Sequence, residues 1–164
     1  MKKSFEVKDK ALLEAAELIL AEVIAIGADE GETWVSRSAL TEVYYELGKV
    51  SMVRTVFSDN VSLKLLKDKR KGSTTLNSFA PEDIRLAVQE AWQAAQSAAP
   101  DEAEGIAELQ ENLSFSAGEE KPDLDAMYGQ LDQLLKDVRQ DFPKISFDSI
   151  GIEHHFGEKL YANT

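Results

Sequence analysis

Hydrophobic residues near the start of the chain recur at steps of three and four and predict an amphipathic helix. The helix begins near Asp9, whose carboxylate can accept a hydrogen bond from a free backbone N–H of the first turn. It ends at Gly27, because glycine adopts the left-handed backbone that often closes a helix at little cost. The predicted apolar face consists of Leu12, Leu13, Ala16, Ile19, Leu20 and Val23.

From residue 29 to residue 77 the pattern changes to alternation of apolar and polar side chains, which predicts half-buried antiparallel strands. The alternation is clearest over residues 50–56 and 61–65. Turn-forming residues interrupt it at three places, which are residues 47–49, 58–60 and 68–72. We therefore expect an antiparallel meander sheet of four to five strands.

A second helix is predicted to open at Pro81, because proline lacks the N–H that a first helical position leaves unpaired. Glu82 and Asp83 follow, where the helix dipole favours negative charge. Its apolar stripe is Ile84, Ala87, Val88, Ala91, Trp92 and Ala95, and residues 99–100 end it. Two helices that bracket a meander can both pack on its one apolar face, so residues 1–100 are predicted to form a two-layer α+β domain.

Beyond residue 100 the chain becomes acidic. Residues 101–121 hold seven acidic side chains and few large apolar ones, which is typical of a solvated linker. A third helix is predicted over residues 123–141, and alternating apolar residues after Pro143 predict a further strand. The expected domains are residues 1–100, the acidic linker 101–121, and a helix and strand at 122–164 that lead into a C-terminal domain missing here.

Charge and composition narrow the classes of function. The chain has 164 residues, a formal net charge of −12 and no cysteine. Phosphate backbones and anionic membranes are bound chiefly through Lys and Arg, so we expect no direct contact with nucleic acid or membrane. The missing cysteine excludes disulfides, thiolate nucleophiles and cysteine-ligated metals. Most of the charge belongs to residues 101–141, which hold 12 acidic and three basic side chains.

The sequence also predicts a cytoplasmic location. No stretch reaches the roughly 20 apolar residues that a membrane span requires. Residues 1–6 carry positive charge, but the apolar stretch and cleavage site of a signal peptide do not follow.

The two histidines do not belong to a recognisable catalytic or metal-binding motif. His154 and His155 are adjacent, and successive strand residues point to opposite faces, so they do not easily share one site. We expect His154 on a packed face with Ile152 and Phe156, and His155 in solvent. The helical histidine pair of zinc peptidases, the serine-nucleophile elbow and the phosphate-binding glycine loops are missing from the sequence. We therefore assign no catalytic, cofactor-binding or metal-ligating residue.

Basic side chains concentrate at one predicted turn. They are Lys64, Lys67, Lys69, Arg70 and Lys71. This cluster is either a docking patch for an acidic partner or the solvated tip of a strand pair, where lysines discourage edge-to-edge pairing. We favour the tip, because no aromatic platform accompanies the lysines. Aromatic residues elsewhere are interpreted as core and strand-pair residues; these are Trp34, Tyr44, Tyr45, Phe57 and Trp92.

The order of these pieces resembles the N-terminal domain of the TldD/PmbA (TldE) family, whose members are named as metallopeptidases and as modulators of DNA gyrase. The resemblance covers residues 10 to about 104 and rests on five segments in sequence. They are residues 27–38, 58–65, 68–77, 81–91 and 99–102. Residues 33–37 resemble the PmbA-like branch more than the TldD-like branch.

The resemblance implies a non-catalytic N-terminal part of a zinc metallopeptidase subunit that acts in proteolysis and peptide maturation. In the family, the His-Glu-x-x-x-His motif and a later cysteine that bind zinc belong to a C-terminal domain. This sequence contains neither, so no zinc ligand is carried over and no cofactor is expected in this part of the protein. The implied partners are a homologous TldD/PmbA-type subunit, in a homo- or hetero-oligomer, and unfolded peptide.

Two other hypotheses stay open, and whether the chain is an enzyme is uncertain. In the first, a stand-alone module binds an extended peptide or an acidic partner at a sheet edge. In the second, a small enzyme uses His154 or His155 with a carboxylate. The first hypothesis and the family interpretation differ in whether the coding region continues past Thr164 into a large β-rich domain.

Overall fold

The structure is a computed structural model that describes residues 9–108 and 112–164. The residues on which the signal-peptide prediction rests lie outside these ranges. The described residues form two compact units. Unit 1 takes them from Met1–Arg37, Ser58–Ser116 and Glu158–Thr164, and unit 2 from Ser38–Phe57 and Ala117–Gly157. The predicted domain boundaries at residues 100 and 121 stay a prediction.

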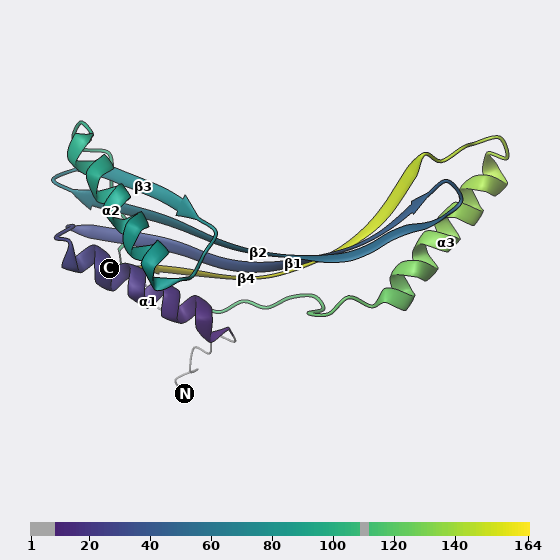
Figure 1. Cartoon of the computed structure of the whole chain (residues 1–164), viewed down its shortest axis with the longest axis horizontal. Helices are drawn as coiled ribbons and strands as arrows, with labels where there is room; N and C mark the ends of the chain where they lie inside the picture. Colours follow the sequence, from purple (N-terminus) through teal and green to yellow (C-terminus); the bar gives the residue numbers. More distant parts are fainter. Residues whose placement is uncertain (1–8, 109–111) are drawn as a thin grey trace. The chain divides into compact units, whose positions relative to one another are not determined.

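The described residues form three helices and four strands (Figure 1). In chain order they are α1 (Lys10–Ala25), β1 (Glu30–Glu46), β2 (Lys49–Lys67), β3 (Arg70–Leu76), α2 (Pro81–Ser97), α3 (Leu124–Asp141) and β4 (Ser149–Asn163). The strands make one open antiparallel sheet in the order β3-β2-β1-β4. The predicted α+β class is confirmed.

Helix boundaries follow the predicted helix ends. Asp9 accepts a hydrogen bond from the Ala11 N–H at 2.9 Å at the start of α1, and Gly27 has a φ of 95° just beyond its end. Helix α2 begins at Pro81. The Asp123 carboxylate accepts from the Ala126 N–H at 2.9 Å and caps α3.

One predicted turn is wrong. The chain turns at Leu47 and Gly48 and again at Asp68 and Lys69, all with positive φ, as the sequence predicts. Residues 58–60, however, lie inside β2. Their polar groups bind the neighbouring strand instead of forming a turn, so residues 29–77 hold three long strands rather than four or five, and β4 completes the sheet.

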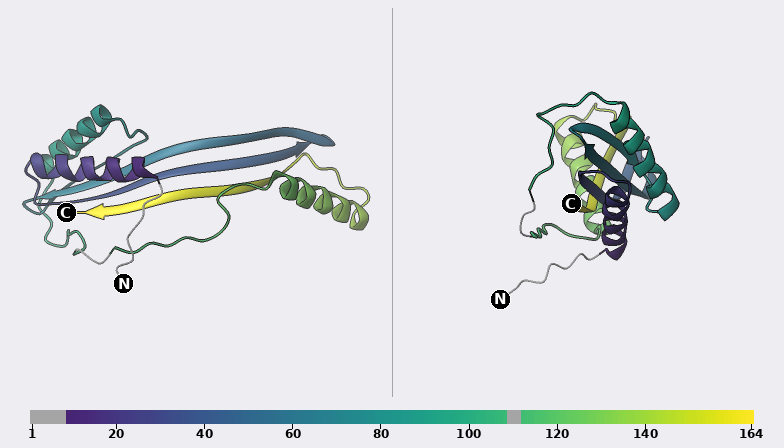
Figure 2. Two further views of the ribbon diagram at one scale, coloured as in Figure 1. Left: turned by 90° about the horizontal axis from the view of Figure 1, so that it is seen from below. Right: turned by 90° about the vertical axis from the view of Figure 1, so that its left-hand side faces the viewer.

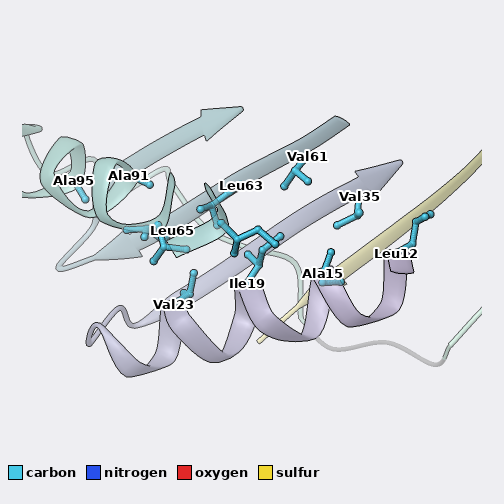
Figure 3. Packing of buried hydrophobic residues seen from close by; sticks show 13 residues of the cluster. Leu12, Ala15, Ile19, Val23, Val35, Val61, Leu63, Leu65, Ala91 and Ala95 are labelled. Atoms are coloured by element: carbon cyan, nitrogen blue, oxygen red, sulfur yellow. The ribbon is translucent and has the colours of Figure 1, made fainter. Parts of the chain in front are cut away.

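The core of unit 1 lies between one face of the strands and the two helices α1 and α2, which both pack on that face (Figure 2). Figure 3 shows Leu12, Ile19 and Val23 of α1 pointing toward the strands. Opposite them lie Val35 of β1 and the alternate β2 residues Val61, Leu63 and Leu65, all fully buried. Each such side chain contributes about 1.5–3 kcal/mol through burial.

Helix α2 packs directly on β3 at Gly72. A Cβ atom at this position would lie 1.7 Å from the carbonyl oxygen of Ala91 and 2.9 Å from the backbone nitrogen of Ala95. No side chain fits there, because real Cβ atoms do not approach backbone atoms below 3.0 Å. Glycine at residue 72 therefore sets how closely the helix approaches the strand.

Arg37 connects three segments of unit 1. Its Nε and Nη2 atoms donate to the two Asp59 oxygens at 2.7 and 2.8 Å, and its Nη1 atom donates to Asp9 at 3.0 Å. Its guanidinium carbon also lies 5.1 Å from the ring centroid of Phe79. The hydrogen bonds to Asp59 raise the pKa of Arg37 and lower the pKa of Asp59.

The first residues of the acidic segment bind unit 1. The Asp101 N–H donates to the Lys69 carbonyl at 2.8 Å, and the Lys64 ammonium donates to the Gly105 carbonyl at 2.9 Å. The Asn163 amide donates to the Ala107 carbonyl at 2.6 Å. These contacts tie residues 101–107 to the strand ends of β2 and β4.

Unit 2 has its own small core. One face of α3 packs on Val43 of β1 through Met127, Leu131 and Leu135, and all four side chains are buried. Ile150 and Ile152 of β4 pack against the same cluster. Helix α3 therefore covers the β1 and β4 side of this unit, and the cluster contains no residue of β2.

Candidate functional site: the open edge of β2

The outer edge of β2 is paired along less than half of its length. Strand β3 pairs with β2 only from Val61, opposite Leu76, to Lys67, opposite Arg70. Over residues 49–60 no strand lies on that side of β2 anywhere in the described ranges. At about 3.3 Å per residue, this open edge presents unpaired backbone N–H and C=O groups over roughly 40 Å.

Apolar side chains project from the open edge into solvent. Val50, Val53 and Val56 are 43%, 44% and 39% exposed, and Phe57 is 75% exposed. A strand that carried such residues in isolation would be prone to pair with another chain. Backbone pairing together with contacts to these side chains is the mode by which extended polypeptides add to a sheet.

The open edge has few of the usual features that block such pairing. Residues 49–60 contain no proline, and their basic residues are Lys49 and Arg54. Arg54 donates from Nε to the buried carboxylate of Glu42 at 2.5 Å, and this hydrogen bond raises its pKa. The guanidinium is thereby held against β1 instead of standing free at the edge.

Side-chain hydrogen bonds connect β2 to β1 behind the open edge. The hydroxyl groups of Thr41 and Thr55 lie 2.9 Å apart across the two strands. The Ser51 hydroxyl donates to the Tyr44 carbonyl at 3.3 Å. A partner strand would thus meet a template that is held in place by side-chain hydrogen bonds as well as by the backbone ladder.

The basic cluster at the β2–β3 turn is largely neutralised. Lys67 binds Asp29 at 2.7 Å, which lowers the pKa of Asp29 and raises that of Lys67. Lys64 binds Glu104 at 3.1 Å, and Lys71 binds the same carboxylate. Lys71 and then Lys64 lower the pKa of Glu104. These ion pairs favour the interpretation of the basic cluster as the tip of a strand pair and not as a docking patch for an acidic partner.

The histidines lie on opposite faces of β4, as predicted from their adjacency. His154 is half-buried, and its Nε2 atom lies 3.1 Å from the Glu119 carbonyl oxygen. His155 is exposed, with Nε2 3.2 Å from the Glu153 carboxylate. Within residues 9–108 and 112–164, no group of three His, Cys, Asp or Glu side chains could hold a metal ion.

Among the aromatic residues interpreted as core and strand-pair residues, Trp34 fits this interpretation, whereas Phe57 is not part of a core in the described residues. Trp34 does form a strand pair with Tyr161, with ring centroids 4.6 Å apart. Burial, together with a 2.8 Å hydrogen bond to Glu32, raises the pKa of Tyr161 to about 12. Phe57, however, is exposed and packs in no core among the described residues. Because residues 58–60 were expected to form a turn, the sequence did not indicate that Phe57 lies on an open strand.

The fold and the open edge define an α+β domain with a surface suited to strand pairing. Residues 35–95 match the sequence model of the family described as PmbA/TldA metallopeptidase domain 1. This match confirms the resemblance to the PmbA/TldD family that the sequence indicates. No curated protein sequence matches the chain.

Solved structures share the fold. TldE from Thermococcus kodakarensis matches 92% of the chain with a TM-score of 0.69 and 24% identity. Candidate DNA gyrase modulators from Thermotoga maritima MSB8 and Bacteroides thetaiotaomicron VPI-5482 match 93% of it, with TM-scores of 0.67 and 0.63 and identities of 18% and 16%. The chain spans only 35%, 35% and 36% of these three proteins, in the same order.

Proposed function

We propose that this chain is the non-catalytic N-terminal part of a TldD/PmbA-type metallopeptidase subunit. In this proposal it contributes to subunit assembly and holds unfolded peptide for proteolysis and peptide maturation. The family match over residues 35–95 supports the assignment to this class of protein. The open edge of β2 is the single observation that supports a role in binding another polypeptide.

The chemistry of the chain supports a non-catalytic role. The sequence contains no cysteine and no His-Glu-x-x-x-His motif. Zinc, if the whole protein uses it, is proposed to belong to a C-terminal domain, and no step of the present proposal involves it. We propose a cytoplasmic location; none of the described helices is long and apolar enough to cross a bilayer.

Association with a second subunit tests the assembly role. The chain is mixed with a full-length PmbA/TldD-family subunit, and the mass of the mixture is measured by light scattering. We expect a complex with the unchanged chain and about tenfold weaker association for Val53→Lys, because an ammonium at the edge disfavours strand pairing. Leu134→Lys is the matched control, since this α3 residue is 46% exposed, close to the 44% of Val53.

Equal association of both variants would contradict the assignment of the open edge of β2. The non-catalytic role has a separate test, in which reduced and carboxymethylated α-lactalbumin is incubated with the chain and zinc. We expect binding without cleavage. Cleavage that disappears when both His154 and His155 are replaced by alanine would instead support the small-enzyme hypothesis.

The second candidate function is a stand-alone module that binds an extended peptide at the same edge. The unpaired backbone of residues 49–60 favours it as strongly as it favours subunit assembly. The two proposals differ in the partner. A module of this kind would bind unfolded polypeptide but no family subunit, whereas the assembly role requires the subunit.

A further inference from the structure

A second edge to which an extended polypeptide could add lies in unit 1, on the outer side of β3. Strand β3 is an edge strand of the sheet, and its inner side pairs with β2 along its whole length. Its outer side faces no strand among residues 9–108 and 112–164. In antiparallel pairing every second residue of an edge strand directs its N–H and C=O outward. The outer side of β3 can therefore accept a further strand.

A groove of about 320 Å³ lies where this outer edge meets α2. It is lined by Thr75 and Leu76 of β3 and by Leu86 and Glu90 of α2. Thr75 and Leu76 are the last two residues of β3, and Asn77 and Ser78, which follow the strand, line the groove as well. The groove therefore lies at the end of β3 where the chain leads into α2. Because the inner edge of β3 is paired with β2, an extended segment that enters the groove can pair only with the outer edge.

The wall that α2 contributes is apolar and acidic. Leu86, which is 58% exposed, lies one turn from Asp83 and one turn from Glu90 along the helix, and both carboxylates line the groove. Across the described residues neither carboxylate has an ion-pair partner. The neighbouring Arg85 is bound to Glu22 of α1 at 2.9 Å. The groove thus presents uncompensated negative charge beside an exposed leucine.

From these observations we propose that the groove between β3 and α2 binds an extended polypeptide segment that carries basic side chains. The segment adds a strand to β3, and its side chains on the helical face meet Leu86 and the two carboxylates. The negative charge of the groove favours a basic segment over an acidic one. The acidic segment 101–121 and a second copy of a chain with net charge −12 would both be repelled. This site is separate from the open edge of β2 and does not rest on the proposed function.

The test uses two labelled eight-residue peptides and fluorescence anisotropy. One alternates valine with arginine, and the other alternates valine with glutamate. We expect the arginine peptide to bind with a Kd of about 1 mM or tighter and the glutamate peptide to bind at least tenfold more weakly. Raising the salt concentration should narrow this difference, because exposed charges are screened.

The double variant Asp83→Asn and Glu90→Gln should weaken binding of the arginine peptide about 3- to 10-fold. Its matched control is Glu14→Gln with Glu17→Gln, which removes the same charge from the exposed face of α1 and should leave binding unchanged. In the Val53→Lys variant, in which the edge of β2 is blocked, the preference for the arginine peptide should persist, which separates this site from the edge of β2. Equal binding of the two peptides, no binding of either, or an unaffected double variant would overturn the proposal. So would self-association that the double variant abolishes, because it would assign the groove to a second copy.

Discussion

At the scale of single residues, Arg37 has a set of partners that the sequence did not reveal. It donates to Asp59 from two nitrogens and to Asp9, which also caps α1. A bidentate arginine–carboxylate pair holds its geometry better than a lysine pair would. Sequence analysis could not find this set, because the residues are separated by 22 and 28 positions and no local pattern relates them.

Replacing Arg37 by methionine should lower the free energy of unfolding by about 1–2 kcal/mol near neutral pH, since two carboxylates lose their partner. The loss should shrink as the pH falls below the ordinary aspartate value of 3.8. Arg37 lowers the pKa of Asp59, so the pair stabilises the fold above that value and is lost when Asp59 is protonated. Urea unfolding at several pH values measures this.

Arg85→Met is the matched control, because Arg85 has a single exposed partner, Glu22. It should cost less than half as much as Arg37→Met. A loss for Arg37→Met that stays constant down to acid pH would mean that packing on Phe79, and not charge, is what Arg37 contributes.

At the scale of elements, the contact of α2 with β3 depends on Gly72. Gly72→Ala should destabilise the protein by about 3 kcal/mol or more, because a methyl group would overlap the Ala91 carbonyl and push the helix away. Thermal unfolding followed by circular dichroism measures the effect. Gly105→Ala is the control, since nothing lies within 4 Å of a Cβ there. Equal melting temperatures for both variants would contradict the close packing.

The helix ends that the sequence predicts correctly are set by interactions between residues close together in the sequence. Asp9, Gly27, Pro81 and Asp123 act through their own backbone or through N–H groups within three residues, so the sequence reveals them. Residues 58–60 have the composition of a turn, but their conformation depends on β1, which pairs with them. Asp59 binds Arg37, and the Ser36 hydroxyl donates to the Asn60 carbonyl at 3.5 Å. Tertiary pairing overrode the local preference.

The same error concealed the candidate site. With a turn at residues 58–60, residues 50–56 would be one of several short strands in the middle of a meander, with partners on both sides. As part of the 19-residue β2 they extend beyond β3 and keep an open side. The spacing of Val50, Val53 and Val56 was the available signal, since these exposed valines fall at steps of three. A strand with one buried face instead carries its apolar residues at steps of two.

At the scale of the whole molecule, a family match is combined with an exposed strand. Residues 35–95 match PmbA/TldA metallopeptidase domain 1, and the chain spans about a third of the solved proteins that share its fold. The central proposal is that residues 49–60 of β2 pair with another polypeptide. That claim concerns backbone hydrogen bonds, so the most direct test observes the backbone amides themselves.

Hydrogen exchange of the β2 amides, read by mass spectrometry with and without a full-length family subunit, provides that test. In the free chain we expect slower exchange in residues 61–67, which pair with β3, than in residues 49–60. Addition of the subunit should slow exchange in residues 49–60 and leave residues 61–67 unchanged. A complex that forms while residues 49–60 keep their free exchange rates would contradict the account.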